Sequence, residues 1–222
     1  IYEALLVYQG GLVFYGGLVG GVLGGIAYLR YCRIPVIPAG DIALTFMPLA
    51  HAIGRLGCFL NGCCWGRPTS LPWGVTYPRS QWGAFHQQVE DGLVAADAKV
   101  SLAVHPTQAY EMLGLLVIFA IMLYAYKHRR YVGGCFFLYP VLYGILRFSN
   151  EFLRGDSEHP LAGLTVAQGI SLGLIAFGLI GLAISYTGRW QHLDPDMMPE
   201  TAEPEAPAVD AGGDGPNGND QA

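Results

Sequence analysis

Five long apolar segments, separated by more polar stretches, constrain the fold of this chain more than any other feature. A helix that crosses a membrane needs about 20 mostly apolar residues, and each segment is close to that length. The segments cover residues 5–28, 39–60, 107–126, 135–153 and 164–186. Only 13% of the chain is charged, against about 25% in soluble domains. We therefore predict an all-α, polytopic membrane protein with five transmembrane helices.

Basic residues predict how these helices are oriented. Arg30 and Arg33 follow the first segment, a cluster at 127–130 follows the third, and Arg189 follows the fifth. Cytoplasmic ends carry an excess of Lys and Arg, so we expect the N-terminus outside the cell and the C-terminus inside. The loop 67–105 then forms an extracytoplasmic region, and the second and fourth segments end on that same outer side.

Composition divides the chain at about residue 190. Residues 1–190 carry the apolar segments and are expected to form one transmembrane domain. Residues 191–222 are rich in Pro, Glu, Asp, Gly and Ala, a composition that cannot bury enough apolar surface to offset its ordering entropy. We expect a disordered, acidic cytoplasmic tail. The chain has no basic patch with interleaved aromatic residues, so we expect no nucleic-acid partner.

Polar residues near the outer end of the second segment indicate a binding site within the membrane. An arginine at the centre of a membrane helix costs roughly 2.5–3.5 kcal/mol, and such residues usually face a cavity or a polar ligand. His51 and Arg55 are four residues apart and share a helix face, and Asn61 follows near the helix end. An arginine that snorkels to lipid headgroups is the alternative. Four glycines leave room around Arg55: Gly54, Gly57, Gly62 and Gly66.

A second polar stripe lies on the fourth segment. Tyr143, Arg147, Glu151 and Arg154 follow one another at spacings of four, four and three, which places them on one helix face. Glu151 would hold Arg147, whose planar guanidinium suits bidentate binding of a phosphate. A structural Arg–Glu pair between helices is the alternative. Two arginine-bearing membrane segments together predict a pocket for an anion.

The third segment begins with His105-Pro-Thr-Gln-Ala-Tyr-Glu111. A proline suits the first turn of a helix, so one interpretation is that this motif starts and caps the helix. The other is that His105, Gln108 and Glu111, which lie within two turns near the outer interface, have a catalytic or orienting role.

Three of the five cysteines, Cys58, Cys63 and Cys64, lie beside the arginine of the second segment. Their spacing matches no standard zinc pattern, and cysteine often packs as a small hydrophobic residue. We therefore expect buried thiols and no bound metal. A disulfide in an oxidising outer compartment and a metal site are the two alternatives.

Glycines repeat along the first segment, mostly every four residues, from Gly10 to Gly25. Small residues on one helix face allow a neighbouring helix to approach closely. We expect this face to be a packing seam, and room for a lipid chain near Tyr15 is the alternative.

Together the three motifs resemble those of the prolipoprotein diacylglyceryl transferase family. The run from Gly54 to Gly66 is similar to the family's Arg-Gly-aromatic-Asn-Gly signature. His105–Glu111 resembles its His-Pro-Ser-Gln-Leu-Tyr-Glu, and Tyr143–Arg154 resembles its Tyr-Gly-x-x-Arg-Phe-x-x-Glu-Phe-x-Arg. Each motif alone is moderately specific, but the three in family order are highly specific. Because the family has seven membrane helices, the resemblance implies that two helices precede this chain.

The resemblance implies an enzyme of the bacterial cytoplasmic (inner) membrane that acts in lipoprotein biogenesis. Its reaction transfers the diacylglyceryl group of phosphatidylglycerol to the lipobox cysteine in the signal peptide of a preprolipoprotein, and glycerol-1-phosphate leaves. The partners are then phosphatidylglycerol, that signal peptide and membrane lipid, with no cofactor. A phosphate-ester leaving group also calls for fixed positive charge in a low dielectric. The rival is a membrane lipid-binding or transport protein that uses the arginines without catalysis.

The resemblance also assigns candidate site residues. We expect a catalytic role for Arg55, Arg147, Tyr15, Glu151 and Tyr143. We expect phosphatidylglycerol to contact Arg55, Asn61, Gly66, Arg147, Arg154, His105 and Glu111. Tyr15 occupies a position where the family often has histidine, and Cys58 and Cys63 replace residues that are often asparagine and glutamate. The thiolate is the nucleophile, so a base must remove its proton, and the candidates are Tyr15, His51, Glu111 and Glu151.

Overall fold

The computed structural model describes residues 11–81, 83–155 and 163–190, without the side chains of residues 11–16 and 18. The chain folds into helices, and its described part contains isolated β-bridges in place of longer strands. The helices are α1 (Gly11–Tyr31), α2 (Val36–Asn61), α3 (Gly83–Glu90), α4 (Thr107–Lys127), α5 (Gly134–Glu151) and α6 (Val166–Tyr186). All five predicted apolar segments contain a long helix. The short helix α3, inside the loop between α2 and α4, was not predicted.

Three of the described helices are long and apolar enough to cross a membrane: α2, α4 and α6. This supports the predicted helical membrane protein. That α1 and α5 also cross the membrane stays a prediction. Helix α5 has 18 residues and carries the polar stripe, which lowers its apolar character. The expected disordered tail, residues 191–222, lies outside the described residues.

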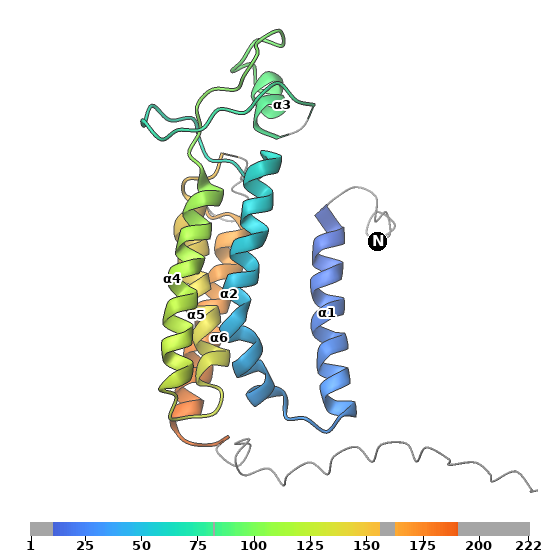
Figure 1. The fold of residues 1–222 in the computed structure, drawn as a ribbon, viewed down its shortest axis with the longest axis vertical. Helices are drawn as coiled ribbons and strands as arrows, with labels where there is room; N and C mark the ends of the chain where they lie inside the picture. The colour runs from blue at the N-terminus through green and yellow to red at the C-terminus, as the bar shows by residue number, and fades with distance from the viewer. Residues whose placement is uncertain (1–10, 82, 156–162, 191–222) are drawn as a thin grey trace, which may run out of the picture.

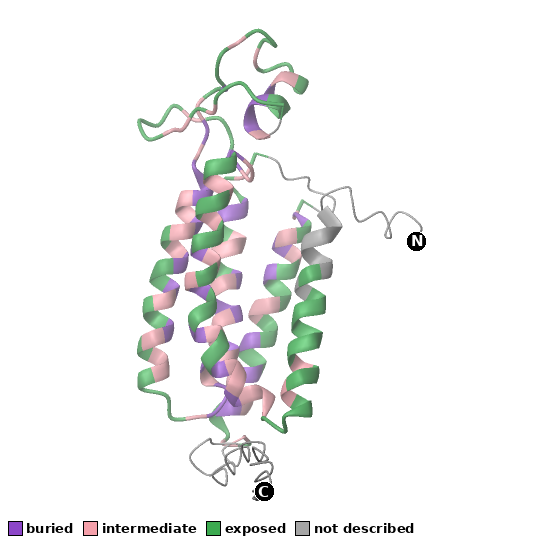
Figure 2. Ribbon diagram, turned by 45° about the vertical axis from the view of Figure 1, so that its right-hand side comes forward, coloured by how far each residue is buried: buried purple, intermediate pink, exposed green. Residues whose placement is uncertain are grey.

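Helices α2, α4, α5 and α6 form a bundle, and α1 stands beside α2 with little contact (Figure 1). Buried residues face the interior of the bundle and exposed residues cover its outside (Figure 2). The expected packing seam of α1 meets no described helix. A Cβ atom added at Gly17, Gly20, Gly21, Gly24 or Gly25 would have no atom within 4 Å.

Small residues instead bring α5 and α6 together. A Cβ atom at Gly178 would lie 2.6 Å from the carbonyl oxygen of Phe137, and one at Gly181 would overlap the ring of Phe137. A Cβ atom at Gly144 would lie 2.9 Å from the carbonyl oxygen of Ser171. Close approach at small residues, of the kind expected for α1, is found between α5 and α6.

A buried carboxylate fixes the N-terminal end of α5. Asp41, on α2 and 1% exposed, accepts hydrogen bonds from the backbone N–H groups of Gly133 and Phe136, both at 2.7 Å. These groups belong to the first turn of α5, where the helix dipole favours negative charge. Asp41 thus docks the start of α5 against α2 at the end of the molecule opposite α3.

The loop between α2 and α4 is an ordered cap over one end of the bundle (Figure 1). Helix α2 ends at Gly62, whose φ of 71° provides a left-handed cap. Val104 pairs with Pro68 and with Val75 through short bridges, and it packs with Trp65 and Ala84 in a small core. This cap holds the ends of α2 and α4 in register, which positions the polar residues below it.

Candidate functional site

Glu111, on α4, is the centre of a buried polar cluster between three helices. Its side chain is 1% exposed, and Oε1 forms an ion pair of 2.8 Å with Arg55 of α2. Its other oxygen, Oε2, accepts a hydrogen bond of 3.1 Å from Asn150 of α5. His51, one turn before Arg55, has its Nε2 atom 4.0 Å from Oε1. The carboxylate therefore connects α2, α4 and α5.

Glu151, on α5, organises the second half of the cluster. It forms an ion pair of 2.6 Å with Arg147, one turn earlier on the same helix. Arg154, just after the helix end, has its Nε atom 3.8 Å from the same carboxylate oxygen. The predicted stripe on one face of α5 is confirmed in the structure.

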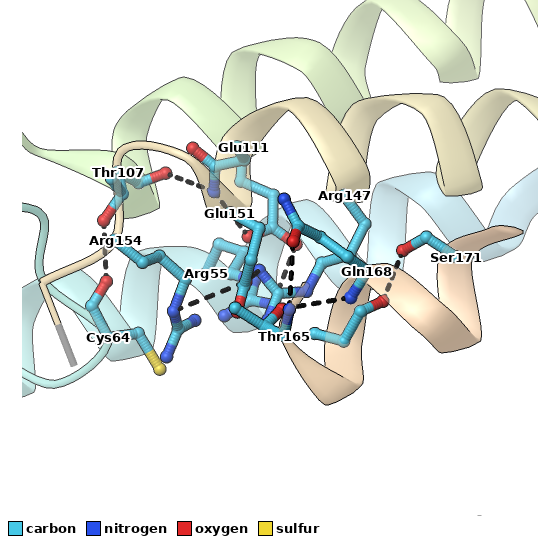
Figure 3. A network of polar contacts seen from close by, with 12 residues as sticks. Arg55, Cys64, Thr107, Glu111, Arg147, Glu151, Arg154, Thr165, Gln168 and Ser171 are labelled. Carbon is cyan, nitrogen blue, oxygen red and sulfur yellow. Dashed lines mark hydrogen bonds and ion pairs between the residues drawn. The ribbon is translucent and has the colours of Figure 1, made fainter. Parts of the chain in front are cut away.

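Asn150 joins the two halves, because it lies next to Glu151 in the chain and donates a hydrogen bond to Glu111. Figure 3 shows Glu111, Glu151 and the three arginines gathered in this network of polar contacts. It also donates to the backbone carbonyl of Thr107 at 3.3 Å, which ties α5 to the first turn of α4. The rings of His51 and Tyr143 lie 5.1 Å apart, which places Tyr143 at the border of the cluster. We call these residues the arginine cluster: His51, Arg55, Glu111, Tyr143, Arg147, Asn150, Glu151 and Arg154.

The arginine cluster is suited to an anion. Three guanidinium groups face two carboxylates, which leaves one net positive charge when His51 is neutral. The carboxylates are 1% and 3% exposed, whereas Arg55 and Arg147 are 13% and 15% exposed. The acidic groups thus stay inside and hold the arginines, whose side chains keep a small exposed fraction. The Nε atom of Arg55 is buried and has no hydrogen-bond partner among the described residues.

Two kinds of glycine surround this region. A Cβ atom at Gly54 or Gly57 would meet nothing within 4 Å, so the face of α2 beside Arg55 is open. Gly66 has the opposite role, because a Cβ atom there would lie 2.5 Å from that of His105 and 2.8 Å from the carbonyl oxygen of Leu153. The backbones of the loop, α4 and α5 converge there, and only glycine fits.

Two other predicted site residues, His105 and Asn61, make contacts with residues outside the arginine cluster. The backbone carbonyl oxygen of His105 accepts a hydrogen bond of 2.9 Å from the N–H group of Gly66, and the Nδ1 atom of the His105 ring lies 3.4 Å from the hydroxyl of Tyr110. Asn61 is exposed and lines a hollow of about 190 Å³ in the loop, with Gly62 and Tyr77. Tyr15 is within α1, but its side chain lies outside the described residues, so its predicted role is not tested.

Sequence analysis missed two buried polar residues that shape the site, Asn150 and Thr107. Thr107 donates to the carbonyl group of Cys64 at 2.7 Å, and the predicted candidate Gln108 donates to that of Cys63 at 2.6 Å. Gln108 also donates to the hydroxyl of Tyr77, at 3.2 Å, and burial raises the pKa of Tyr77 above its ordinary value. An amide next to Glu151 in an apolar helix was the available signal for Asn150.

The three cysteines at the end of α2 come together in space. The sulfur atoms of Cys58, Cys63 and Cys64 all lie within 4.8 Å of one another, and the thiols are free. All three residues are partly exposed, so the expectation of fully buried thiols is wrong. The loop after Gly62 turns back over α2, and this turn gathers residues whose spacing in the chain matched no standard metal pattern.

Comparison with known proteins identifies the family. The family described as prolipoprotein diacylglyceryl transferase matches residues 1–184 of the chain. Proteins named phosphatidylglycerol–prolipoprotein diacylglyceryl transferase are similar to it. The one from Clostridium tetani is 34% identical over 76% of this chain and 62% of its own length. Those from Clostridioides difficile and Ralstonia pickettii are 38% and 35% identical, over 80% and 81% of this chain and 60% and 65% of their own lengths. The chain thus spans somewhat less than two thirds of these relatives, and it belongs to the prolipoprotein diacylglyceryl transferase family.

Proposed function

We propose that this chain transfers the diacylglyceryl group of phosphatidylglycerol to the lipobox cysteine of a preprolipoprotein, in bacterial lipoprotein biogenesis. The cysteine sulfur attacks the diacylglyceryl carbon that bears the phosphate ester. A carbon–sulfur bond forms, the carbon–oxygen bond to phosphate breaks, and glycerol-1-phosphate leaves with the electron pair. The thiol proton passes to a base. This substitution requires no metal or cofactor at the reacting carbon. The names of the similar proteins support both substrates.

The pair of arginines held by buried carboxylates, Arg55 and Arg147, is the observation that carries this proposal. Negative charge grows on the phosphate oxygen as the carbon–oxygen bond breaks, and fixed donors in a dry site stabilise it without reorganisation. Glu111 and Glu151 hold the two guanidinium groups in advance. Arg154, near Glu151, adds positive charge at the loop side of the site.

His51 is the proton acceptor that the geometry favours. Glu111 and Glu151 are each paired with arginine, and proton transfer to either would break that pair. His51 is 27% exposed, more than the buried carboxylates, and lies near the same centre. Neutral imidazole accepts protons near neutral pH. Tyr143 would orient the ring of His51, and Tyr15 would hydrogen-bond the donor phosphate from α1.

We predict that replacing His51 by glutamine lowers turnover by about 10²–10⁴-fold, a range typical for loss of a general base. Glutamine keeps hydrogen-bonding capacity but accepts no proton near neutral pH. The rate at which His51→Gln transfers lipid to a lipobox peptide should therefore increase as pH rises, because the acceptor thiol then ionises without a base. His86→Gln, at an exposed position of α3, should leave the rate unchanged. Wild-type turnover by His51→Gln at neutral pH would rule out this base.

We propose that phosphatidylglycerol reaches the arginine cluster from the membrane along the open face of α2. Exposed apolar side chains, Ile53 and Leu56, flank Gly54 and Gly57 there. The acyl chains would lie on this face and the headgroup would point toward the loop, where Asn61, Gly66 and His105 border it. The orientation predicted from the basic residues, with five membrane crossings and the loop outside, would place this site at the extracytoplasmic leaflet.

The experiment is reconstitution of the purified chain in vesicles that contain phosphatidylglycerol, labelled either in the acyl chains or in the headgroup. A lipobox peptide should gain the acyl label, and the headgroup label should appear as soluble glycerol phosphate. The same peptide with serine in place of cysteine should gain neither label. Binding of phosphatidylglycerol without transfer would contradict the proposal and support the lipid-binding alternative.

A further inference from the structure

The three thiols at the end of α2 form a site that the proposed reaction does not use. From the geometry we infer that Cys58, Cys63 and Cys64 bind one thiophilic metal ion of the zinc class, with a fourth coordination position open to solvent. This inference is independent of the proposed transfer. It reverses the expectation from sequence, because the spacing along the chain did not show that the turn after Gly62 brings the three sulfur atoms together.

The distances suit one ion better than they suit a disulfide. Zinc–sulfur bonds are about 2.3 Å, so three sulfur atoms around a tetrahedral ion lie about 3.8 Å apart. The three sulfur atoms already lie within 4.8 Å of one another, so side-chain rotations that shorten their separations by about 1 Å would bring them to the distance that one ion requires. A disulfide needs sulfur atoms about 2.05 Å apart and leaves the third thiol without a partner. An ion uses all three.

The backbone around the thiols is held in place. Cys64 has a φ of 60°, a left-handed conformation that is rare for a residue with a side chain. Hydrogen bonds to the carbonyl groups of Cys63 and Cys64, donated by Gln108 and Thr107, support it. Gln108 and Thr107 are each 1% exposed. The first turn of α4 therefore fixes the loop that carries two of the three sulfur atoms.

The sulfur ligands determine which class of ion the site can hold. Soft thiolate ligands select zinc-class and copper(I) ions over magnesium or calcium. All three cysteines are partly exposed, so an ion can reach the site from solvent.

Metal binding by the full chain in detergent, reduced and freed of metal, tests the inference. Cadmium serves as the probe because cadmium–thiolate bonds absorb in the ultraviolet, and zinc then competes for the site. We expect one cadmium ion per chain with a thiolate absorption band. Cys63→Ser should weaken binding by at least about tenfold, and Cys58→Ser should behave in the same way. Cys32→Ser is the matched control, because Cys32 is an exposed thiol outside the cluster, and it should bind as the wild type does.

Three results would overturn the inference. The first is wild-type chain that binds no cadmium although all its thiols are titratable. The second is cadmium stoichiometry that is unchanged in the variant lacking Cys58, Cys63 and Cys64. The third is a disulfide within the cluster in chain purified from the membrane without reductant. The first and third results are measured on the wild-type chain, so they decide the question even if a variant fails to fold.

Discussion

At the scale of single residues, the buried carboxylates determine how the arginines act. Glu111 forms an ion pair with Arg55 and accepts a hydrogen bond from the side-chain amide of Asn150. Burying a guanidinium without a partner costs several kcal/mol, so each carboxylate both stabilises the fold and orients a cation. The sequence predicted Glu111, Glu151 and their arginines from helical spacing and family motifs. It could not predict that Asn150 bridges them, because contacts between helices do not follow from spacing within one helix.

Replacing Glu111 by glutamine should destabilise the protein by roughly 3 kcal/mol, because Arg55 would remain buried without its counter-charge. Equilibrium unfolding in detergent measures this loss. Glu90→Gln is the control. Glu90 is 57% exposed and pairs only with His86 among the described contacts, and exposed pairs contribute less than about 1 kcal/mol. Equal stabilities of the two variants would show that the Arg55–Glu111 pair contributes little to the fold.

At the scale of elements, the contacts between helices were harder to predict than the helices. Apolar length predicted all five long helices, and Pro106 marked a helix start that the structure confirms. Glycine spacing, however, pointed to α1 as the closely packed helix. The close approach is found at Gly144, Gly178 and Gly181, between α5 and α6. Glycine permits close packing on any helix, but the two helices approach closely only where a neighbouring helix packs against the glycine.

An alanine at Gly178 should destabilise the α5–α6 pair by about 1–3 kcal/mol, the usual cost of overpacking. Its Cβ atom would lie 2.5 Å from Val141 and 2.6 Å from a backbone oxygen of Phe137. An alanine at Gly173, also on α6, is the matched control, because its Cβ atom would meet nothing within 4 Å. The two variants differ only in position, so thermal unfolding in detergent compares them directly. A control that loses as much stability as Gly178→Ala would contradict this account of the interface.

At the scale of the whole molecule, the basic ends of α1 and α4 lie at one end of the bundle and the loop with α3 lies at the other (Figure 1). From the positive-inside rule we expect the basic end to face the cytoplasm, and this orientation stays a prediction. The sequence predicted this polarity because it depends only on charges and chain order. It did not predict the ordered cap, whose bridges involve short irregular segments without strand periodicity.

Labelling with a membrane-impermeant thiol reagent tests this orientation. In a chain without the other four cysteines, Cys32, between α1 and α2, should react only after the cells are permeabilised. A cysteine introduced at Asp91, an exposed position just after α3, should react in intact cells. The opposite pattern of labelling would contradict the orientation, and with it the placement of the arginine cluster toward the outer leaflet.

The central claim is that Arg55 and Arg147 bind the departing phosphate, and the rate of lipid transfer by Arg147→Ala tests it most directly. We expect the rate to fall by about 10²–10³-fold, as when one donor to a developing anion is removed, in protein that remains folded. Arg147→Lys should recover little, because lysine lacks the planar fork. Arg79→Ala, at an exposed loop position, should transfer lipid at the wild-type rate. Wild-type transfer by folded Arg147→Ala would contradict the claim.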